Sequence, residues 1–278
     1  MSWKTILVHL DDDRRCAERV GIASQLAVRH DAHLIGVSPT GLPDVLLSLN
    51  GAVPDSVGVI TLSADGLREH ALARAAAFEK QARAAEVKSV ESRVIVGEPL
   101  DATAPLGRCA DLVVVGQTDR SAELPGVAWD FPQQLALHIG GPVLVVPYAG
   151  RFRDVGHDVL VAWKDVREAA RALRDALPML ANARRVVLLE LLAPGASADS
   201  TALAEQQARL ARLGIGAEAR REAIGVDAGD ALLSRASELG VDTVVMGAYG
   251  HSRLREWVLG GMTKHLLDHM TVPTLMTH

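Results

Sequence analysis

Three glycines near the C-terminal end have a spacing that could bind a phosphate group. Gly247, Gly250 and Gly260 follow the apolar run TVVM and precede a helical pattern. Glycine allows positive φ and lets a backbone approach a ligand closely, while a helix start offers unpaired N–H donors to an anion. Arg253 and Thr263 add a cation and a hydroxyl. Glycines also serve tight turns and close helix packing, so the spacing alone leaves both interpretations open.

Histidines close to this loop form a second candidate group. His265 and His269 are four residues apart on a predicted helix, a spacing that a metal ion can use. It is equally typical of a solvated helix face, which we favour. Ser252 follows His251, but no acid or further histidine is spaced to complete a triad. Without a P-loop, HExxH or CxxC pattern in the sequence, we expect neither a metal centre nor a catalytic site.

The elements that must position these residues alternate along the chain. Short β-branched runs are separated by longer segments of helical periodicity, which predicts an α/β fold with parallel strands. Continuous apolar strands indicate burial on both faces of the sheet. The predicted strands are KTILVHL, HLIGVS, VESRVIV, DLVVVG and PVLVVP in the first half, and HDVLVAW, RVVLLELL, EARREAI, DTVVMG and PTLMTH in the second. Helices are predicted in RRCAERVGIASQLAVRH, REAARALRDALPMLANA and ALLSRASEL.

The two halves of the chain repeat one another. ADLVVVG, ending at Gly116, matches VDTVVMG, ending at Gly247, at a separation of 131 residues, and PVLVVP matches PTLMTH at the same separation. The first strands, ILVHL and VLVAW, are 153 residues apart, so the first half carries an insertion. We predict two doubly wound, five-stranded parallel-sheet domains, residues 1–150 and 151–278, with the insertion at about 41–66. The insertion could form a lid or a hydrophobic ligand surface, although interdomain packing is the favoured interpretation.

Composition limits the class of protein. The chain has 278 residues, of which 49% are hydrophobic and 23% charged, as in ordinary globular proteins. A formal net charge of −5 gives no general attraction for nucleic acid or an anionic membrane, so neither is an expected partner. Two cysteines are too few for a disulfide framework. No apolar run approaches the roughly 20 residues of a membrane span, and we expect a cytoplasmic protein.

The motifs together point to a family. The spacing G-x2-G-x9-G after a fourth strand, the LVAW first strand, the final VPTLMTH strand and the tandem layout resemble the universal stress protein family in its two-domain form. The resemblance implies a Rossmann-like fold of the adenine nucleotide alpha hydrolase type, with ATP bound in this loop by many members. We therefore expect ATP, accompanied by Mg²⁺, in the C-terminal domain. The expected contacts are Ala162, Lys164, Leu191, Met246, Gly247, Gly250, His251, Arg253, Gly260, Gly261, Met262 and Thr263.

The second half departs from the family pattern at two positions. Nucleotide-binding members have Ser or Thr directly after the third glycine, where this chain has Gly261, although Thr263 keeps the second hydroxyl. They have Asp at the end of the first strand, where this chain has Lys164. Lysine can reach phosphate oxygens but cannot accept a hydrogen bond from a ribose. Trp163, beside it, is expected in the core rather than under a base.

The first half departs in the opposite way. It keeps an acid, Asp11, at the end of its first strand, but the 131-residue offset places Asp119, Trp129 and Asp130 opposite Gly250, Gly260 and Gly261. These side chains would fill the phosphate space and repel its charge, so we predict a degenerate pocket. This region could hold a metal ion through its acidic side chains, but we favour the interpretation that these are solvated loop residues. The acids are Asp11, Asp12, Asp13, Asp119 and Asp130.

Three functions remain open at this point. The favoured one is a stress-response module that binds adenine nucleotide and regulates rather than catalyses. The second is a non-nucleotide ligand-binding or scaffolding protein of the same fold, and the third is a slow ATP hydrolase. Because an apolar edge strand needs a partner, we expect the strands VLVVP and TLMTH to pair, joining the halves as an intramolecular pseudo-dimer. The resemblance also favours a homodimer.

Overall fold

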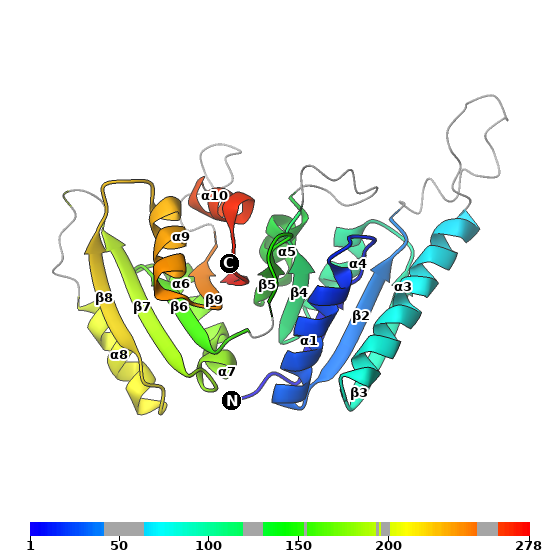
Figure 1. Cartoon of the computed structure of the whole chain (residues 1–278), viewed down its shortest axis with the longest axis horizontal. Helices are drawn as coiled ribbons and strands as arrows, with labels where there is room; N and C mark the ends of the chain where they lie inside the picture. The colour runs from blue at the N-terminus through cyan, green and yellow to red at the C-terminus, as the bar shows by residue number, and fades with distance from the viewer. Residues whose placement is uncertain (42–63, 119–129, 153–154, 193–194, 196–200, 249–260) are drawn as a thin grey trace, which may run out of the picture. The chain divides into compact units, whose positions relative to one another are not determined.

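The computed structural model comprises two compact units (Figure 1), described for residues 1–41, 64–118, 130–152, 155–192, 195, 201–248 and 261–278. One unit is Trp3–Ile139, and the other is Gly140–His278 with Met1–Ser2. The insertion predicted at 41–66 lies almost entirely outside the described residues. Among the described residues, no helix has the length and apolar character needed to cross a membrane.

The first unit alternates strands and helices. Its strands lie in the order β3-β2-β1-β4, and every pairing within this group is parallel. Its elements are β1 (Thr5–His9), α1 (Cys16–His30), β2 (His33–Pro39), α3 (Ala64–Ala84), β3 (Ser89–Ile95), α4 (Pro99–Gly107), β4 (Leu112–Gly116) and α5 (Phe131–Ile139).

The second unit repeats this order and has two further strands, β10 and β5. Its strands lie in the order β5-β10-β9-β6-β7-β8, all parallel except β5, which pairs antiparallel with β10. Its elements are β5 (Val143–Val146), β6 (Asp158–Trp163), α6 (Arg167–Asp175), α7 (Leu177–Leu180), β7 (Arg185–Leu192), α8 (Ala202–Arg212), β8 (Glu218–Ala223), α9 (Ala228–Leu239), β9 (Thr243–Gly247), α10 (Gly261–His269) and β10 (Thr274–Thr277).

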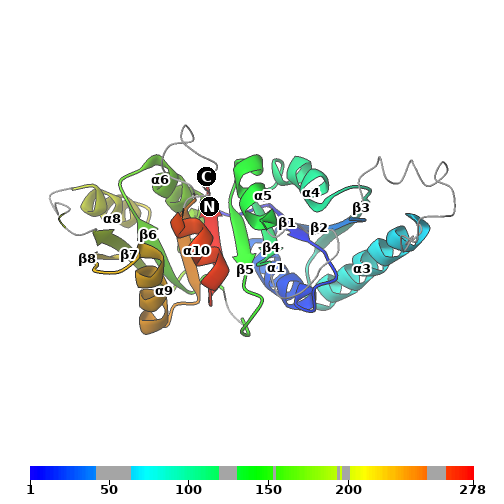
Figure 2. The same ribbon diagram turned by 90° about the horizontal axis from the view of Figure 1, so that it is seen from above.

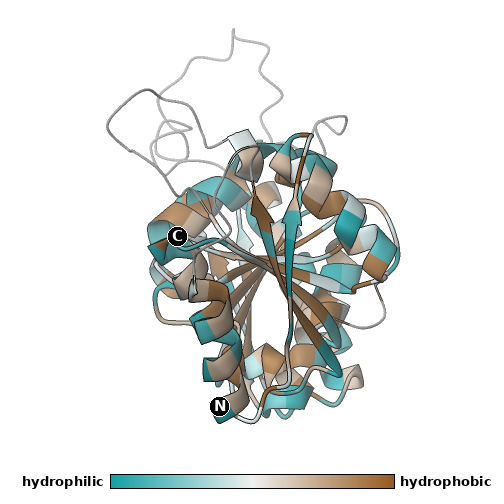
Figure 3. Cartoon of the chain, turned by 90° about the vertical axis from the view of Figure 1, so that its left-hand side faces the viewer, coloured by the Kyte–Doolittle hydropathy of each residue, from teal (hydrophilic) through white to brown (hydrophobic). Residues whose placement is uncertain are grey.

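All ten predicted strands are present, and the fold class is confirmed. Each half of the sequence supplies five strands, and helices cover both faces of the strands in each unit (Figure 2). The strands carry most of the apolar character, as the brown colouring in Figure 3 shows. The side chains of Leu112–Val115 in β4 and of Val159–Val161 in β6 are at most 1% exposed. Burial on both faces explains why these runs are continuous rather than alternating.

The predicted edge-strand pairing is also confirmed. Leu275 of β10 lies opposite Leu144 of β5, with Thr274 opposite Val145 and Met276 opposite Val143. This pairing covers the edge of β10 and places β5 with the second unit, so the structural division falls at residue 140.

One predicted helix is divided in two. The segment REAARALRDALPMLANA forms α6 and then the short α7, with Ala176 between them. Pro178 explains the break, because proline has no N–H to continue the hydrogen-bond ladder and its ring crowds the preceding turn.

Candidate functional site

The topology of the second unit creates a switch point between β6 and β9. From β6 the chain moves to β7 and β8 on one side, and then returns to β9 and β10 on the other. Ligands of such sheets bind beyond the carboxyl ends of the two strands that flank this reversal. Ala162 and Met246 lie side by side there. Met246 is buried and Ala162 is half-buried, so the predicted strand-end contacts are adjacent, as a common site requires.

Gly247, at the end of β9, is required by packing. A Cβ at this position would lie 2.6 Å from Ala169 N and 2.6 Å from the Glu168 carbonyl carbon. The first turn of α6 therefore approaches the strand more closely than any side chain would permit. Of the two interpretations that the glycine spacing left open, close helix packing applies to Gly247.

The first turn of α6 already holds a carboxylate. Val166 is the N-cap residue and makes no side-chain capping bond, but Glu168 accepts a 2.5 Å hydrogen bond from Arg167 Nε. Burial raises the pKa of Glu168, whereas Arg167, the residue's own backbone N–H and His278 lower it, and the net pKa is below the usual value. A negative charge at this helix start disfavours phosphate there, so α10 offers the better position.

The start of α10 is open at its first residue and packed two residues later. Gly261 is exposed, and no atom of the described residues lies within 4 Å of the position that its Cβ would occupy. Met262 is half-buried, and Thr263 is only 4% exposed and already has an interaction partner. The hydroxyl expected to contact phosphate therefore belongs to a residue on the buried side of α10, together with Leu266 and Leu267.

The other predicted contacts fall into three groups. Gly250, His251, Arg253 and Gly260 lie outside the described residues. Lys164 is exposed just beyond β6, and Leu191 is half-buried in the neighbouring β7. Trp163 is 4% exposed, which confirms its expected place in the core.

The switch point of the first unit is filled by a side chain of α1. Arg19 is 1% exposed. Its Nε donates a hydrogen bond to the His9 carbonyl oxygen at 2.9 Å, and its Nη2 donates one to Asp11 Oδ1 at 2.5 Å. A Cβ on Gly116, the counterpart of Gly247, would overlap Arg19 Nη1. The guanidinium thus lies between the carboxyl ends of β1 and β4.

The acids around Arg19 are paired with protein groups. Burial alone would raise the pKa of Asp11, but Arg19 and His9 hold it well below its usual range. Asp12 pairs with Arg74 at 2.6 Å, and Asp13 accepts from the Arg15 N–H at 2.7 Å. The expectation of solvated loop acids is wrong for Asp11, whose side chain is 12% exposed, because the buried guanidinium draws it inward. Asp130 accepts from Gln134 Nε2 at 2.9 Å; Asp119 and Trp129 lie outside the described residues.

Comparison with known proteins identifies the second half. Residues 157–278 match the model of the universal stress protein family. This half of the chain belongs to that family. The resemblance carried by the glycine spacing and the last strand is thereby confirmed where those motifs lie.

Solved structures extend the likeness in fold to both units of the chain. One from Archaeoglobus fulgidus DSM 4304 is similar with a TM-score of 0.73 and 14% identity, over 98% of this chain and 97% of its own. A functionally unknown protein from Pseudomonas aeruginosa PAO1 has a TM-score of 0.60 and 15% identity, over 99% and 92%. A universal stress protein in complex with cAMP covers 54% of this chain and all of its own, with 24% identity and a TM-score of 0.39. No curated protein matches the sequence.

Two residues at the switch points, Arg19 and Glu168, were missed in the sequence. Arg19 interrupts the buried stripe of α1, which continues through Val20, Ile22 and Ala23. A cation on an apolar helix face, eight residues after a strand-end acid, was an available signal for a buried pair. Glu168 gave no such signal, because an acid in the first turn of a helix is ordinary.

The two histidines of α10 lie on a face that is partly solvated, as predicted: His269 is exposed and His265 is half-buried. His265 Nε2 lies 2.7 Å from Asp230 Oδ1 of α9, and its ring stacks on His269 with centroids 4.4 Å apart. Asp227, Asp230 and His265 each offer a ligand atom within 4.8 Å of the others. The two acids are exposed and His265 is half-buried, so this face is partly solvated and also joins α9 to α10.

Proposed function

We propose that this protein is a tandem universal stress protein that binds ATP, with Mg²⁺, at the switch point between β6 and β9. In this proposal it acts as a regulatory module in a stress response rather than as an enzyme. Support comes from the family membership of residues 157–278, from the ATP binding that the family resemblance implies, and from the exposed start of α10 at the same edge.

The difference between the two switch points carries the proposal. In the first unit, the guanidinium of Arg19 pairs with the strand-end acid Asp11. In the second unit, the 153-residue offset of the first strands places Ala172 opposite Arg19 and Lys164 opposite Asp11. In space, backbone atoms of Glu168 and Ala169 lie beside Gly247, where the first unit has the guanidinium beside Gly116, and a cation replaces the acid at the strand end. A neutral ion pair thus gives way to a lone cation, which favours an anionic ligand in the second unit.

The weak basicity of Glu168 supports a regulatory rather than a catalytic role. Hydrolysis of ATP is helped by a group that accepts a proton from the attacking water, and a base is most effective when its pKa lies near the working pH. The pKa of Glu168, whose backbone contacts Gly247, is instead lowered below that of an ordinary glutamate. We expect phosphate release from ATP to stay at the background rate.

The test is calorimetric titration of ATP, with and without Mg²⁺, into the purified chain. Gly261→Asp adds one negative charge at the start of α10, where no atom of the described residues lies within 4 Å of the Cβ position, and an acid is favourable in that first turn. We expect its affinity for ATP to fall at least tenfold, or about 1.4 kcal/mol. Gly261→Ala, the uncharged control, should bind as the parent does. Equal affinity in all three proteins would remove the α10 start from the site.

Gly250→Asp tests the loop itself. The side chain would occupy phosphate space and bring negative charge against negative charge. We expect a loss of roughly 3 kcal/mol, which is over a hundredfold in affinity. Circular dichroism checks that the variant is folded. Unchanged affinity in the folded variant would contradict the assignment to the second unit.

The alternative function is a non-nucleotide ligand-binding or scaffolding protein of the same fold. It is favoured by the carboxylate of Glu168 at the start of α6 and by the burial of Thr263. Mass spectrometry of the denatured, freshly purified protein separates the two functions, because a nucleotide binder is expected to release a carried nucleotide. Absence of nucleotide, together with no heat on titration of ATP, would favour the alternative.

The assembly is a separate part of the proposal. We expect the two halves to act as an intramolecular pseudo-dimer, based on the β5–β10 pairing and the sequence repeat, and the full chain to form a homodimer. Light scattering at several protein concentrations gives the mass, and a monomer at all of them would exclude the homodimer.

A further inference from the structure

The antiparallel strand β5 brings a segment of chain to the opposite edge of the second unit. Because Thr274 at the start of β10 lies opposite Val145 near the end of β5, the chain leaves β5 at the amino ends of the parallel strands. It enters β6 at the same edge. The switch point lies at the carboxyl ends of those strands, so residues 147–152 and 155–157 belong to a different region from the proposed nucleotide site.

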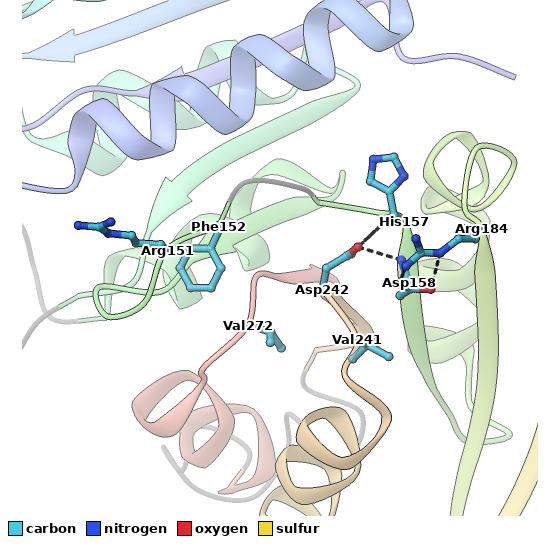
Figure 4. A pocket seen from close by; sticks show the side chains of 8 residues that line it. All are labelled: Arg151, Phe152, His157, Asp158, Arg184, Val241, Asp242 and Val272. Atoms are coloured by element: carbon cyan, nitrogen blue, oxygen red, sulfur yellow. Dashed lines mark hydrogen bonds and ion pairs between the residues drawn. The ribbon is translucent and has the colours of Figure 1, made fainter.

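A cavity of about 650 Å³ lies at this amino edge (Figure 4). We call it the amino-edge cavity. Phe152, Val272 and Val241 supply its apolar surface, and Arg151 and Arg184 lie toward its two ends in Figure 4. Among the described residues, its lining is Arg151, Phe152, His157, Asp158, Arg184, Val241, Asp242 and Val272.

Hydrogen bonds hold the far wall of the amino-edge cavity in place. Asp242 accepts from the backbone N–H groups of Gly156 at 2.8 Å, His157 at 3.0 Å and Asp158 at 2.9 Å. Gly156 has φ +81°, and a Cβ there would lie 2.6 Å from Met179 Cγ, so this bend requires glycine. A preformed wall lowers the entropy cost of binding a ligand.

The ring of Phe152 is held at the other side. Gly150 has φ +99°, and a Cβ there would lie 2.8 Å from Phe152 Cζ. The ring therefore folds back over the backbone of Gly150. Phe152 and Val272 are half-buried and Val241 is 5% exposed, and all three line the amino-edge cavity.

The charges of the lining favour a ligand with one negative charge. The carboxylate of Asp242 is compensated by the N–H groups that it accepts, and Asp158 pairs with Arg184 and, at 3.6 Å, with Arg185. The exposed guanidinium of Arg151 remains as the cation at the mouth. A multiply charged anion would be repelled by Asp158 and Asp242, whereas a neutral ligand would not use Arg151.

We propose that the amino-edge cavity binds a small amphipathic monoanion, an aromatic carboxylate or sulfonate. Its ring lies against Phe152, Val241 and Val272, and its anionic group pairs with Arg151. The volume is within the 300–1,000 Å³ typical of small-molecule sites. This site does not depend on the proposed nucleotide site, since it lies at the other edge of the sheet.

The probe for this proposal is 8-anilinonaphthalene-1-sulfonate, an aromatic sulfonate whose fluorescence rises on binding. The full chain is titrated with the probe, and the variants are checked for folding by circular dichroism. We expect Arg151→Glu to weaken binding at least tenfold and Phe152→Leu several-fold, while Arg151→Lys, which keeps the charge, stays close to the parent. Arg212→Glu, the same charge change at an exposed site on α8, is the matched control and should bind normally.

Competition tests the chemical class. Naphthalene-1-sulfonate should displace the probe, and neutral naphthalene-1-methanol should do so at least tenfold less well. The proposal is overturned if Arg151→Glu and Phe152→Leu bind the probe as the parent does, if Arg212→Glu loses as much affinity, or if the neutral compound competes equally. Saturating ATP should leave probe affinity unchanged, whereas direct competition by ATP would place the probe at the nucleotide site and overturn the assignment.

Discussion

The guanidinium of Arg19 and the carboxylate of Asp11 form a buried pair whose members depend on one another. Their side chains are 1% and 12% exposed, and Arg19 also holds the carbonyl oxygen of His9. Removing one partner of a buried pair leaves an uncompensated charge, whereas replacing both with neutral groups is often tolerated. The switch point, which resembles a ligand site in the second unit, is therefore part of the core in the first unit.

We predict that Arg19→Met lowers the free energy of unfolding by about 3–5 kcal/mol. The double variant Arg19→Met with Asp11→Asn should recover a large part of that loss, because no buried charge is left unpaired. Urea denaturation of the full chain measures both. If the double variant were as unstable as the sum of its single changes, the two side chains would not be coupled.

His30 gives the first unit a dependence on pH. It is 4% exposed and packs on Trp3, with ring centroids 4.8 Å apart. Burial lowers its pKa from 6.5 to about 4, and Arg29 and Lys4 add to the effect. The unfolded chain therefore binds a proton between pH 6.5 and 4 that the folded chain does not, so His30 destabilises the fold as the pH falls through this window.

We expect the His30 contribution to stability to fall by about 2 kcal/mol between pH 7 and pH 5, at 1.4 kcal/mol per pH unit below the unfolded pKa. The variant His30→Gln should lose less stability than the parent over this range. Urea titrations at pH 7 and pH 5 compare the two proteins. Parallel losses in both would show that His30 is not the titrating group.

At the scale of elements, α6 packs directly against β9 because Gly247 has no side chain. Gly247 allows backbone atoms of Glu168 and Ala169 to approach to 2.6 Å of its Cβ position. Neither partner can move like the end of a flexible side chain, because both are backbone in the first turn of α6. The position of this helix start relative to the switch point therefore depends on Gly247.

We predict that Gly247→Ala costs about 1–3 kcal/mol of stability, as overpacking typically does. Gly216→Ala is the control, since Gly216 is exposed and no atom lies within 4 Å of its Cβ position; it should change stability by less than about 0.5 kcal/mol. Thermal unfolding of both variants measures the difference. If Gly247→Ala were as stable as Gly216→Ala, α6 would be able to shift away from β9 without loss of stability.

At the scale of the whole molecule, β5 belongs structurally with the second unit although its sequence repeat assigns it to the first half. The repeat places the boundary near residue 150, and contacts place it at residue 140. Three registered residue pairs join β5 to β10. Removal of β5 would expose the edge of β10, which carries unpaired N–H and C=O groups.

We predict that a fragment of residues 140–278 unfolds cooperatively and is more stable than a fragment of residues 151–278. The shorter fragment should self-associate through the exposed β10 edge, because an open edge strand pairs with another chain. Light scattering and urea denaturation compare the two fragments. Equal stability and equal mass would show that β5 does not protect β10.

The sequence alone determined the α/β class, the ten strands and the repeat of the two halves. Runs such as LVVVG and TVVMG are local patterns, and burial of parallel strands on both faces makes such runs apolar throughout. The family resemblance of the last 40 residues was likewise carried by local spacing. These features are readable because each depends on neighbours along the chain.

Only the tertiary structure decided which nearby groups meet at each switch point. That Gly247 accommodates α6 and that Arg19 fills the space beside Gly116 depend on distances between segments far apart in sequence. The same is true of the amino-edge cavity, whose lining spans Arg151 to Val272. Spacing along one segment cannot specify these contacts, because packing between elements sets which side chain reaches a shared space.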